Sequence, residues 1–268
     1  MNRTLVAVAL AVYALSSPLK AQWTPLNFQV VDSDWSAQLQ RIVMISANPH
    51  QLHIYNPVTN ADTTVPLPAA PLSVSVGPDG LFAAVGYNFF VSYVSLSPAR
   101  MEKTMPVSYA ASRVGLAGNG YIYSPPYRLN INTGIEVYQN DSAGNSRVLV
   151  HPSSQVLYTS DSYVYKYGIT PERLTDLAFA PDPCGSMWLI AGGAKIVTAC
   201  GSVLEAGDSP TTRIEKLGQL SASGISCCET VIAAAHVSGT SIAALRTGIK
   251  QYSGDDVIAF YDPSTYAL

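Results

Sequence analysis

Charged residues are scarce in this chain, and none of them gather into a basic patch. Asp, Glu, Lys and Arg make up 12% of the 268 residues, the formal net charge is −3, and no run of Lys or Arg occurs. Nucleic acids and anionic membranes are bound through clustered positive charge. The composition therefore argues against both as the main partner.

Sequence signatures of catalysis and metal binding are also missing. There is no Gly-x-Ser-x-Gly elbow, no His-Glu-x-x-His pair and no phosphate-binding Gly-x-x-x-x-Gly-Lys loop. No Cys/His spacing matches zinc, and no Asp-x-Asp-x-Asp-Gly loop matches calcium. We therefore predict no metal and no cofactor, and the pattern identifies no catalytic residue.

A membrane-spanning run is missing as well, and the apolar run that does occur lies near the N-terminus. Leu5–Leu15 offers about 11 apolar residues, whereas a spanning helix needs about 20. Arg3 precedes this run, and Leu19–Ala21 forms a small-residue cleavage site. We predict a signal peptide over 1–21 and a mature domain over 22–268 that is secreted or periplasmic. An uncleaved membrane anchor is the alternative.

Turn formers and tyrosine are abundant, with 19 Gly, 18 Pro and 16 Tyr. Such a composition is typical of many short strands and turns. One landmark recurs, an apolar strand followed by a tight turn and a second apolar strand. Its copies span 74–84, 114–123, 148–158 and 187–197.

A second landmark is a later turn that usually carries proline. Its copies span 55–60, 96–100, 130–134, 169–172, 208–212 and 261–266. Pro171 and Pro210 are 39 residues apart, the same offset that the first landmark gives for that pair of units. A period near 40 residues, with about four short strands in each unit, is typical of a β-propeller blade.

The period predicts an all-β fold with a single β-propeller of about six four-stranded blades, six or seven in number. The approximate units are 32–68, 72–108, 112–142, 146–178, 184–220 and 224–268. The sixth unit stops soon after its Pro263 turn, so we expect the N-terminal segment Leu26–Val31 to pair beside Asp256–Tyr261 and close the last blade. A β-sandwich is the alternative fold.

These units resemble those of secreted bacterial propellers of the YVTN/quinoprotein-amine-dehydrogenase-like superfamily, a relative of WD and NHL propellers. The resemblance covers nearly all of the mature chain. It rests on Pro78-Asp79-Gly80 followed by apolar residues, and on Tyr261-Asp262-Pro263-Ser264-Thr265 after a strand. The literal Tyr-Val-Thr-Asn tetrapeptide is absent. Members are often seven-bladed and include binding proteins as well as enzymes, so the resemblance implies no single activity.

Four cysteines in an exported chain suggest disulfides. Cys184 and Cys200 flank a hairpin whose turn is Gly192-Gly193, and they should lie nearly opposite each other, so we predict that they are bonded. The adjacent pair Cys227-Cys228 is a candidate vicinal disulfide, which propeller quinoprotein dehydrogenases place beside their cofactor. The alternative is a pair of strand-edge cysteines, which we favour because the repeated Trp docking motifs of those enzymes are missing.

Three tyrosines are candidates for a binding surface. Tyr163, Tyr165 and Tyr167 alternate along one expected strand and share a face, while Val164 and Lys166 take the other. Aromatic rows of this kind contact partners, but they also pack one blade against the next. We favour packing.

The leading hypothesis is an exported, non-enzymatic propeller that acts as a scaffold or binds an unknown protein or small molecule at one end of the ring. The alternative is a propeller enzyme, either a quinoprotein-like oxidoreductase or a lactonase-like hydrolase. A third hypothesis is a truncated form of a longer protein. The first two differ in whether loops at one end bring carboxylates, a histidine or an arginine to the central channel.

Overall fold

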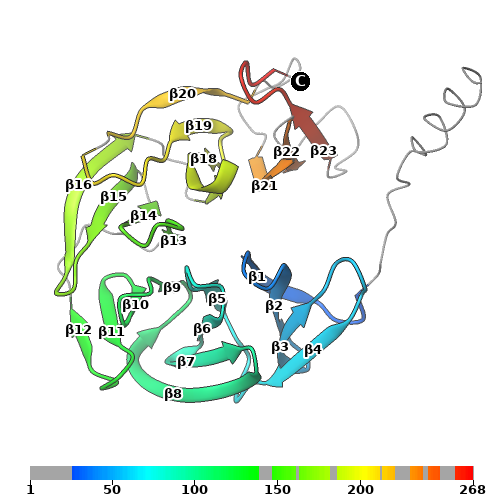
Figure 1. Ribbon diagram of the computed structural model, residues 1–268, viewed down its shortest axis with the longest axis vertical. Coiled ribbons are helices and arrows are strands. Elements are labelled where there is room, and N and C mark those ends of the chain that lie inside the picture. Colours follow the sequence, from blue (N-terminus) through cyan, green and yellow to red (C-terminus); the bar gives the residue numbers. More distant parts are fainter. Residues whose placement is uncertain are drawn as a thin grey trace, which may run out of the picture.

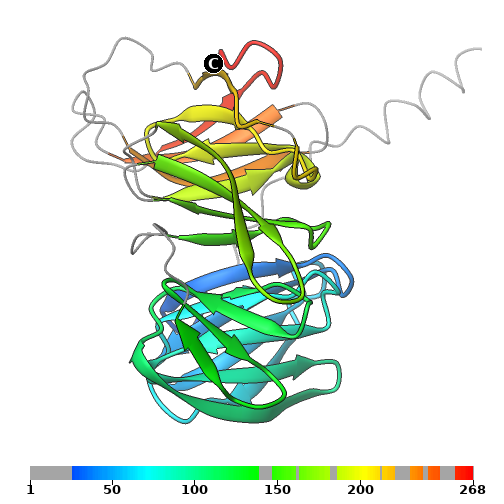
Figure 2. The same ribbon diagram turned by 90° about the vertical axis from the view of Figure 1, so that its left-hand side faces the viewer.

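The computed structural model arranges antiparallel sheets around a central axis, with the innermost strand of each sheet facing that axis (Figure 1). It describes residues 26–138, 147–160, 163–181, 186–211, 213–220, 230–237, 241–247 and 257–267. Seen from the side, the outer strands of the sheets face outward, away from the central axis (Figure 2). This arrangement is a β-propeller, as the repeat period predicts.

The first three sheets are β1 (Val30–Ser36), β2 (Arg41–Ala47), β3 (His50–Tyr55) and β4 (Asp62–Pro66); β5 (Ser73–Val76), β6 (Phe82–Gly86), β7 (Asn88–Leu96) and β8 (Ala99–Ala110); and β9 (Gly115–Leu116), β10 (Tyr121–Ser124), β11 (Tyr127–Asn130) and β12 (Glu136–Tyr138). The other three are β13 (Val148–Val150), β14 (Val156–Ser160), β15 (Tyr163–Ile169) and β16 (Leu174–Pro181); β17 (Met187–Ile190), β18 (Lys195–Thr198), β19 (Ser202–Glu205) and β20 (Lys216–Gln219); and β21 (Thr230–Val237), β22 (Ser241–Thr247) and β23 (Val257–Tyr261).

A single turn of 3-10 helix, Ala191–Gly193, joins β17 to β18. Within the described ranges, no helix is long and apolar enough to cross a membrane.

Both sequence landmarks fall where the period requires them. Each copy of the first landmark is the hairpin between the first and second strands of a sheet, and each copy of the second is the turn after the third strand. The hairpin around Gly192-Gly193 has the expected register, with Met187 opposite Thr198 and Ile190 opposite Lys195.

The predicted blade number was wrong. Five sheets are four-stranded blades, and the sixth has three strands in the order β21-β22-β23. The turn that follows β23 is present, but the described residues end at Ala267, one residue beyond Tyr266. The residues of the Pro263 turn mark the sixth unit correctly because a turn depends on neighbouring residues. A fourth strand depends on pairing with another strand, and the repeat period carries no information about that pairing.

The predicted closing strand was also wrong where the structure describes it. Val30 and Val31 belong to β1, which pairs with β2 and places Val30 opposite Ser46. The carboxylate of Asp32 accepts a hydrogen bond of 3.0 Å from the Val74 backbone N–H, and that of Asp34 accepts one of 2.7 Å from Val76 N–H. These bonds hold β1 beside β5, at the inner edge of the first blade. The described part of β23 pairs with β22.

The core lies between successive blades. Val43, Ile45 and Leu52 of the first blade form one buried cluster with Val74 and Val85 of the second. Because neighbouring blades cover both faces of the middle strands, these strands are apolar without alternation, and Ala83–Val85 is fully buried. Burial between blades therefore holds the sheets in their circular order.

A recurrent hydrogen bond joins each of four blades to the one before it. The acceptor is always a backbone carbonyl in the turn after the third strand, the second sequence landmark. The bonds are Lys103 Nζ to Ile131 O (2.7 Å), Asn119 Nδ2 to Thr170 O (3.2 Å), Lys166 Nζ to Ser209 O (2.8 Å) and Lys195 Nζ to Pro263 O (2.9 Å). The repeated turn is thus a point of attachment between blades.

Candidate functional site

The inner strands of the five four-stranded blades line a central cavity of about 920 Å³. Among the described residues, four charged side chains take part in this lining, Asp32, Asp34, Arg113 and Arg147. They come from β1 and from the residues just before β9 and β13, so three different blades supply them. Arginines and carboxylates therefore converge on the channel, which is the feature on which the binding and enzyme hypotheses differ.

Three of these charges lie near one mouth of the channel. Arg113 and Arg147 each precede the first valine of an inner hairpin, in the position that Ser73 and Ser186 hold in their own blades. Asp32 of the first blade reaches the same level, because its Oδ1 lies 3.9 Å from Nη2 of Arg147. The repeat thus places equivalent positions of several blades in one layer, which we call the mouth layer: Asp32, Ser73, Arg113, Arg147 and Ser186.

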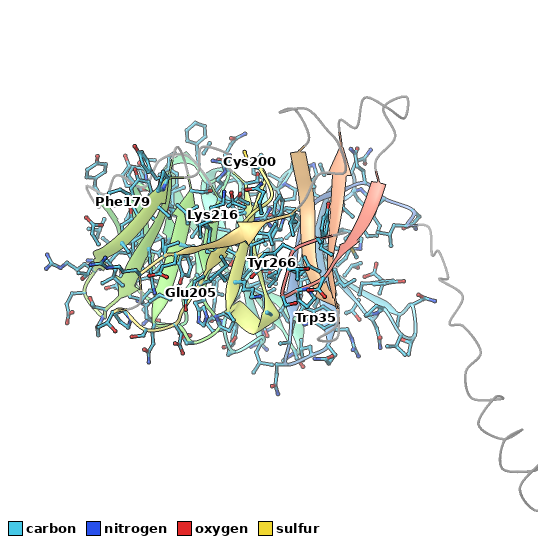
Figure 3. All side chains as sticks on the ribbon, turned by 90° about the horizontal axis from the view of Figure 1, so that it is seen from above. Trp35, Phe179, Cys200, Glu205, Lys216 and Tyr266 are labelled. Atoms are coloured by element: carbon cyan, nitrogen blue, oxygen red, sulfur yellow. The ribbon has the colours of Figure 1, made fainter. Side chains whose placement is uncertain are left out.

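Figure 3 identifies the two ends of the propeller. Phe179 and Cys200 lie toward one end of the strands, and Trp35 and Glu205 lie toward the other. The Ala199 N–H donates to the Ser186 carbonyl at 2.8 Å, so the mouth layer is at the end that Phe179 and Cys200 share. Trp35, near the end of β1, marks the opposite end.

Asp34 lies deeper in the channel than Asp32, two residues farther along β1. Its Oδ1 accepts a hydrogen bond of 2.8 Å from the Trp35 N–H, in addition to the bond from Val76. Loss of water by burial raises the pKa of Asp34 to about 6, although these N–H groups and Arg147 act in the opposite direction. Asp34 therefore changes its charge in mildly acidic solution.

The two arginines of the mouth layer are incompletely neutralised. Arg113 is exposed and makes no hydrogen bond or ion pair with the described part of the chain. Partial loss of water around its guanidinium group, and then the nearby positive charge of Arg147, lower the pKa of Arg113. Arg147 has the distant contact with Asp32, and its Cζ stands 6.0 Å from the ring centroid of Trp188.

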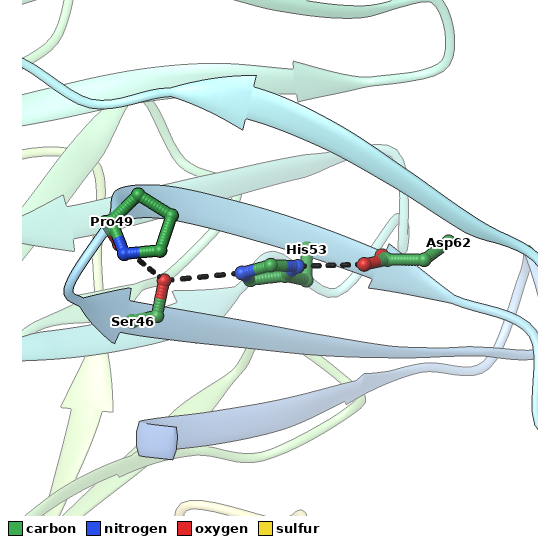
Figure 4. Close-up of polar contacts among 4 residues, drawn as sticks. All are labelled: Ser46, Pro49, His53 and Asp62. Carbon is green, nitrogen blue, oxygen red and sulfur yellow. Dashed lines mark hydrogen bonds and ion pairs between the residues drawn. The ribbon is translucent and has the colours of Figure 1, made fainter. Parts of the chain in front are cut away.

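A serine, a histidine and an aspartate form a hydrogen-bonded chain in the first blade (Figure 4). His53 Nδ1 lies 2.7 Å from Asp62 Oδ2, and His53 Nε2 lies 3.1 Å from Ser46 Oγ. The order of residues is that of a hydrolase triad. Sequence reasoning missed it because no local motif contains the three, and the available signal was a polar residue within each of the apolar strands β2 and β3.

The surroundings of this chain do not suit catalysis. Ser46 is fully buried and His53 is 3% exposed, so a substrate has no access to the hydroxyl. The Ser46 hydroxyl donates to the Pro49 carbonyl at 2.5 Å, which is a closer partner than the imidazole. His53 stacks on Phe28 with ring centroids 3.6 Å apart. These hydrogen bonds therefore connect the side chains of β2, β3 and β4 and have a structural role.

The three candidate tyrosines differ in their environments. Tyr167 is 1% exposed and belongs to the core between the third and fourth blades, whereas Tyr163 is 39% exposed. Tyr165 is intermediate in burial. The ring of Phe179, on the neighbouring strand β16, meets Tyr163 edge-on at 5.6 Å and is 66% exposed. Along β15, therefore, Tyr167 packs in the core, whereas Tyr163 belongs to an exposed aromatic surface.

The cysteine predictions fall largely outside the described residues. Cys184, Cys227 and Cys228 all lie there, so the Cys184–Cys200 bond and the vicinal pair stay predictions. Cys200 follows β18 in an exposed turn, and its carbonyl accepts a hydrogen bond from Gln219. In the part of the chain that is described, no three His, Cys, Asp or Glu side chains gather in a way that could hold a metal ion.

No protein-family model and no curated protein matches this sequence. Among solved structures, one titled "Structure of U3-55K" is similar with a TM-score of 0.58 at 12% identity, over 90% of this chain and 85% of that one. A second, "Crystal structure of RRP9 WD40 repeats", has a TM-score of 0.58 at 13% identity, over 90% and 84%. At this identity the likeness shows the fold alone, a β-propeller of the WD40 type.

Proposed function

We propose that the protein is an exported, non-enzymatic propeller that binds a ligand at the mouth of its central channel. The observation that carries this proposal is the mouth layer, where Arg113, Arg147 and Asp32 border a cavity of about 920 Å³. A concave site with a few converging polar groups is the usual form of a ligand pocket. The WD40-type fold supports a binding or scaffold role as a fold-level analogy.

Export rests on the sequence. The predicted signal peptide over 1–21 supports secretion or transfer to the periplasm. N-terminal sequencing of protein collected outside the producing cytoplasm should begin at Gln22. Recovery of full-length chain from the cytoplasm alone would contradict this part of the proposal.

The binding role is favoured over catalysis because, among the described residues, no histidine lines the cavity beside the serines of the mouth layer to activate them as nucleophiles. The hydrogen-bonded group with the residue types of a hydrolase that the described residues contain, Ser46-His53-Asp62, is buried in the first blade. The polar groups that do face the cavity are suited to holding a charged ligand by hydrogen bonds and ion pairs.

The test is a thermal-shift screen of the mature chain against charged and neutral small molecules, repeated with a double variant, Arg113→Gln and Arg147→Gln. Binding of a ligand raises the melting temperature by mass action. We expect at least one molecule to stabilise the wild type and to have no effect on the double variant. If every stabilising molecule acts equally on both proteins, the mouth of the channel is not the binding site.

A further inference from the structure

The mouth layer holds two like charges close together. Arg113 and Arg147 belong to neighbouring blades and stand at equivalent positions of their inner strands. Their mutual repulsion contributes to the lowered pKa of Arg113. Two guanidinium groups in one channel are unfavourable in isolation, and an anion placed between them relieves the repulsion.

The acidic groups of the channel are poorly placed to do this. Asp32 Oδ2 accepts the Val74 N–H, and its Oδ1 approaches Arg147 at 3.9 Å, longer than a hydrogen bond. Both oxygens of Asp34 accept backbone N–H groups. The carboxylates thus serve the inner strands β1 and β5, and among the described residues neither arginine donates a guanidinium hydrogen bond.

The chemistry of the surroundings favours a carboxylate over a phosphate. A guanidinium group binds either anion through two parallel hydrogen bonds, so the preference rests on charge and on the surrounding surface. A phosphate carries more negative charge, and the nearby Asp32 and Asp34 would repel it more strongly than a monoanion. Trp188 and Leu149 also line the cavity, so an apolar body attached to the carboxylate would have surface to contact.

We infer that Arg113 and Arg147 together bind a carboxylate group, and that Arg147 exchanges its contact with Asp32 for the ligand. This inference rests on the proposed function and names its ligand class. The carboxylate could belong to a free organic acid or to an acidic peptide, since both present the same group.

Calorimetry at low ionic strength tests the inference with four probes: butyrate, phenylacetate, a capped peptide with a single glutamate and inorganic phosphate. We expect at least one carboxylate probe to bind more tightly than phosphate. Its affinity should fall about tenfold or more in Arg113→Gln and in Arg147→Gln, because each variant removes one charged bidentate contact. Preference for butyrate or phenylacetate indicates a free acid, and preference for the peptide indicates an acidic side chain of a protein.

Arg100→Gln is the matched control, because Arg100 is an exposed arginine that pairs with Glu102 outside the channel. It should bind the probes as the wild type does. Failure of all three carboxylates to bind, equal affinity in the channel variants, or tighter binding of phosphate would each overturn the inference. If the screen finds a channel ligand that lacks a carboxylate, the proposed function stands and the ligand class is wrong; if it finds no channel ligand at all, both fail.

Discussion

The ammonium group of Lys195 lies 3.1 Å from the hydroxyl of Tyr266 and joins the fifth blade to the turn that follows the last strand. The same group donates to the Pro263 carbonyl at 2.9 Å. Tyr266 is 7% exposed and packs against Gly218 of β20, where a Cβ atom would come within 2.2 Å of the ring. One lysine and one glycine thus fix how the last sheet docks.

Lys195→Met should destabilise the protein by about 1–3 kcal/mol, because it leaves the Pro263 carbonyl without its charged donor. Urea unfolding of variant and wild type measures this change. Lys216→Met is the control, since Lys216 is an exposed lysine of the same blade whose Nζ bonds a side chain only three residues away, on Gln219. Equal losses in the two variants would contradict a special role for Lys195.

Gly86→Ala should destabilise the fold by about 1–3 kcal/mol through overpacking. A Cβ atom at Gly86, on β6, would lie 2.0 Å from the Ala111 carbonyl oxygen, and this neighbour is backbone. Gly168→Ala in β15 is the matched control, because its Cβ would make ordinary contacts with Leu177 at 3.4 Å. We expect that variant to be neutral or slightly stabilised, as denaturant midpoints will show. A harmless Gly86→Ala would mean that the segment around Ala111 can move away from β6.

The stability of Asp34→Asn relative to the wild type should increase as the pH rises from 4 to 7. Burial raises the pKa of Asp34 to about 6, above its ordinary value of 3.8, so the folded state holds the extra proton between these values. The stability this group contributes is therefore fully present below about pH 4 and is lost as the pH rises through 6. We expect a swing on the order of 1 kcal/mol after solvent screening.

Melting curves of wild type and variant across this pH range measure the swing. Asp262→Asn serves as the control, because hydrogen bonds led by the one from the Ser264 hydroxyl lower the pKa of Asp262 to about 2. Its contribution is present above pH 4 and disappears only in stronger acid, so its difference from wild type should stay constant between pH 4 and 7. A constant difference for Asp34→Asn as well would refute the assigned shift.

A fluorophosphonate probe of serine hydrolases should not label Ser46, because the side chain is buried and its hydroxyl donates to Pro49. His53→Leu should cost about 2–4 kcal/mol, since it removes two hydrogen bonds and leaves buried partners unsatisfied. Mass spectrometry and urea unfolding give the two readouts. Labelling at Ser46 that disappears in His53→Leu, while the variant stays folded, would instead establish a catalytic triad.

The repeat could be predicted from the sequence because its signals are local. Turns such as Pro78-Asp79-Gly80 and the apolar strands beside them mark each unit without any knowledge of its neighbours. Blade number and the partner of β1 depend on contacts between distant residues, above all the bonds from Asp32 and Asp34 to β5. Predicting the mouth layer would also have required knowing how the inner strands align in space, because its arginines stand in no recognisable motif.

Chemical modification of lysine side chains would weaken the contacts between blades. The chain has six lysines, and three of them, Lys103, Lys166 and Lys195, donate to the turn of the following blade. Acylation of such a side chain removes its positive charge and enlarges it, so the bond to the neighbouring carbonyl is lost. A lysine-acylating reagent, often chosen to attach a protein gently to a surface, would here loosen first the joint at the exposed Lys103, because Lys166 is only 1% exposed.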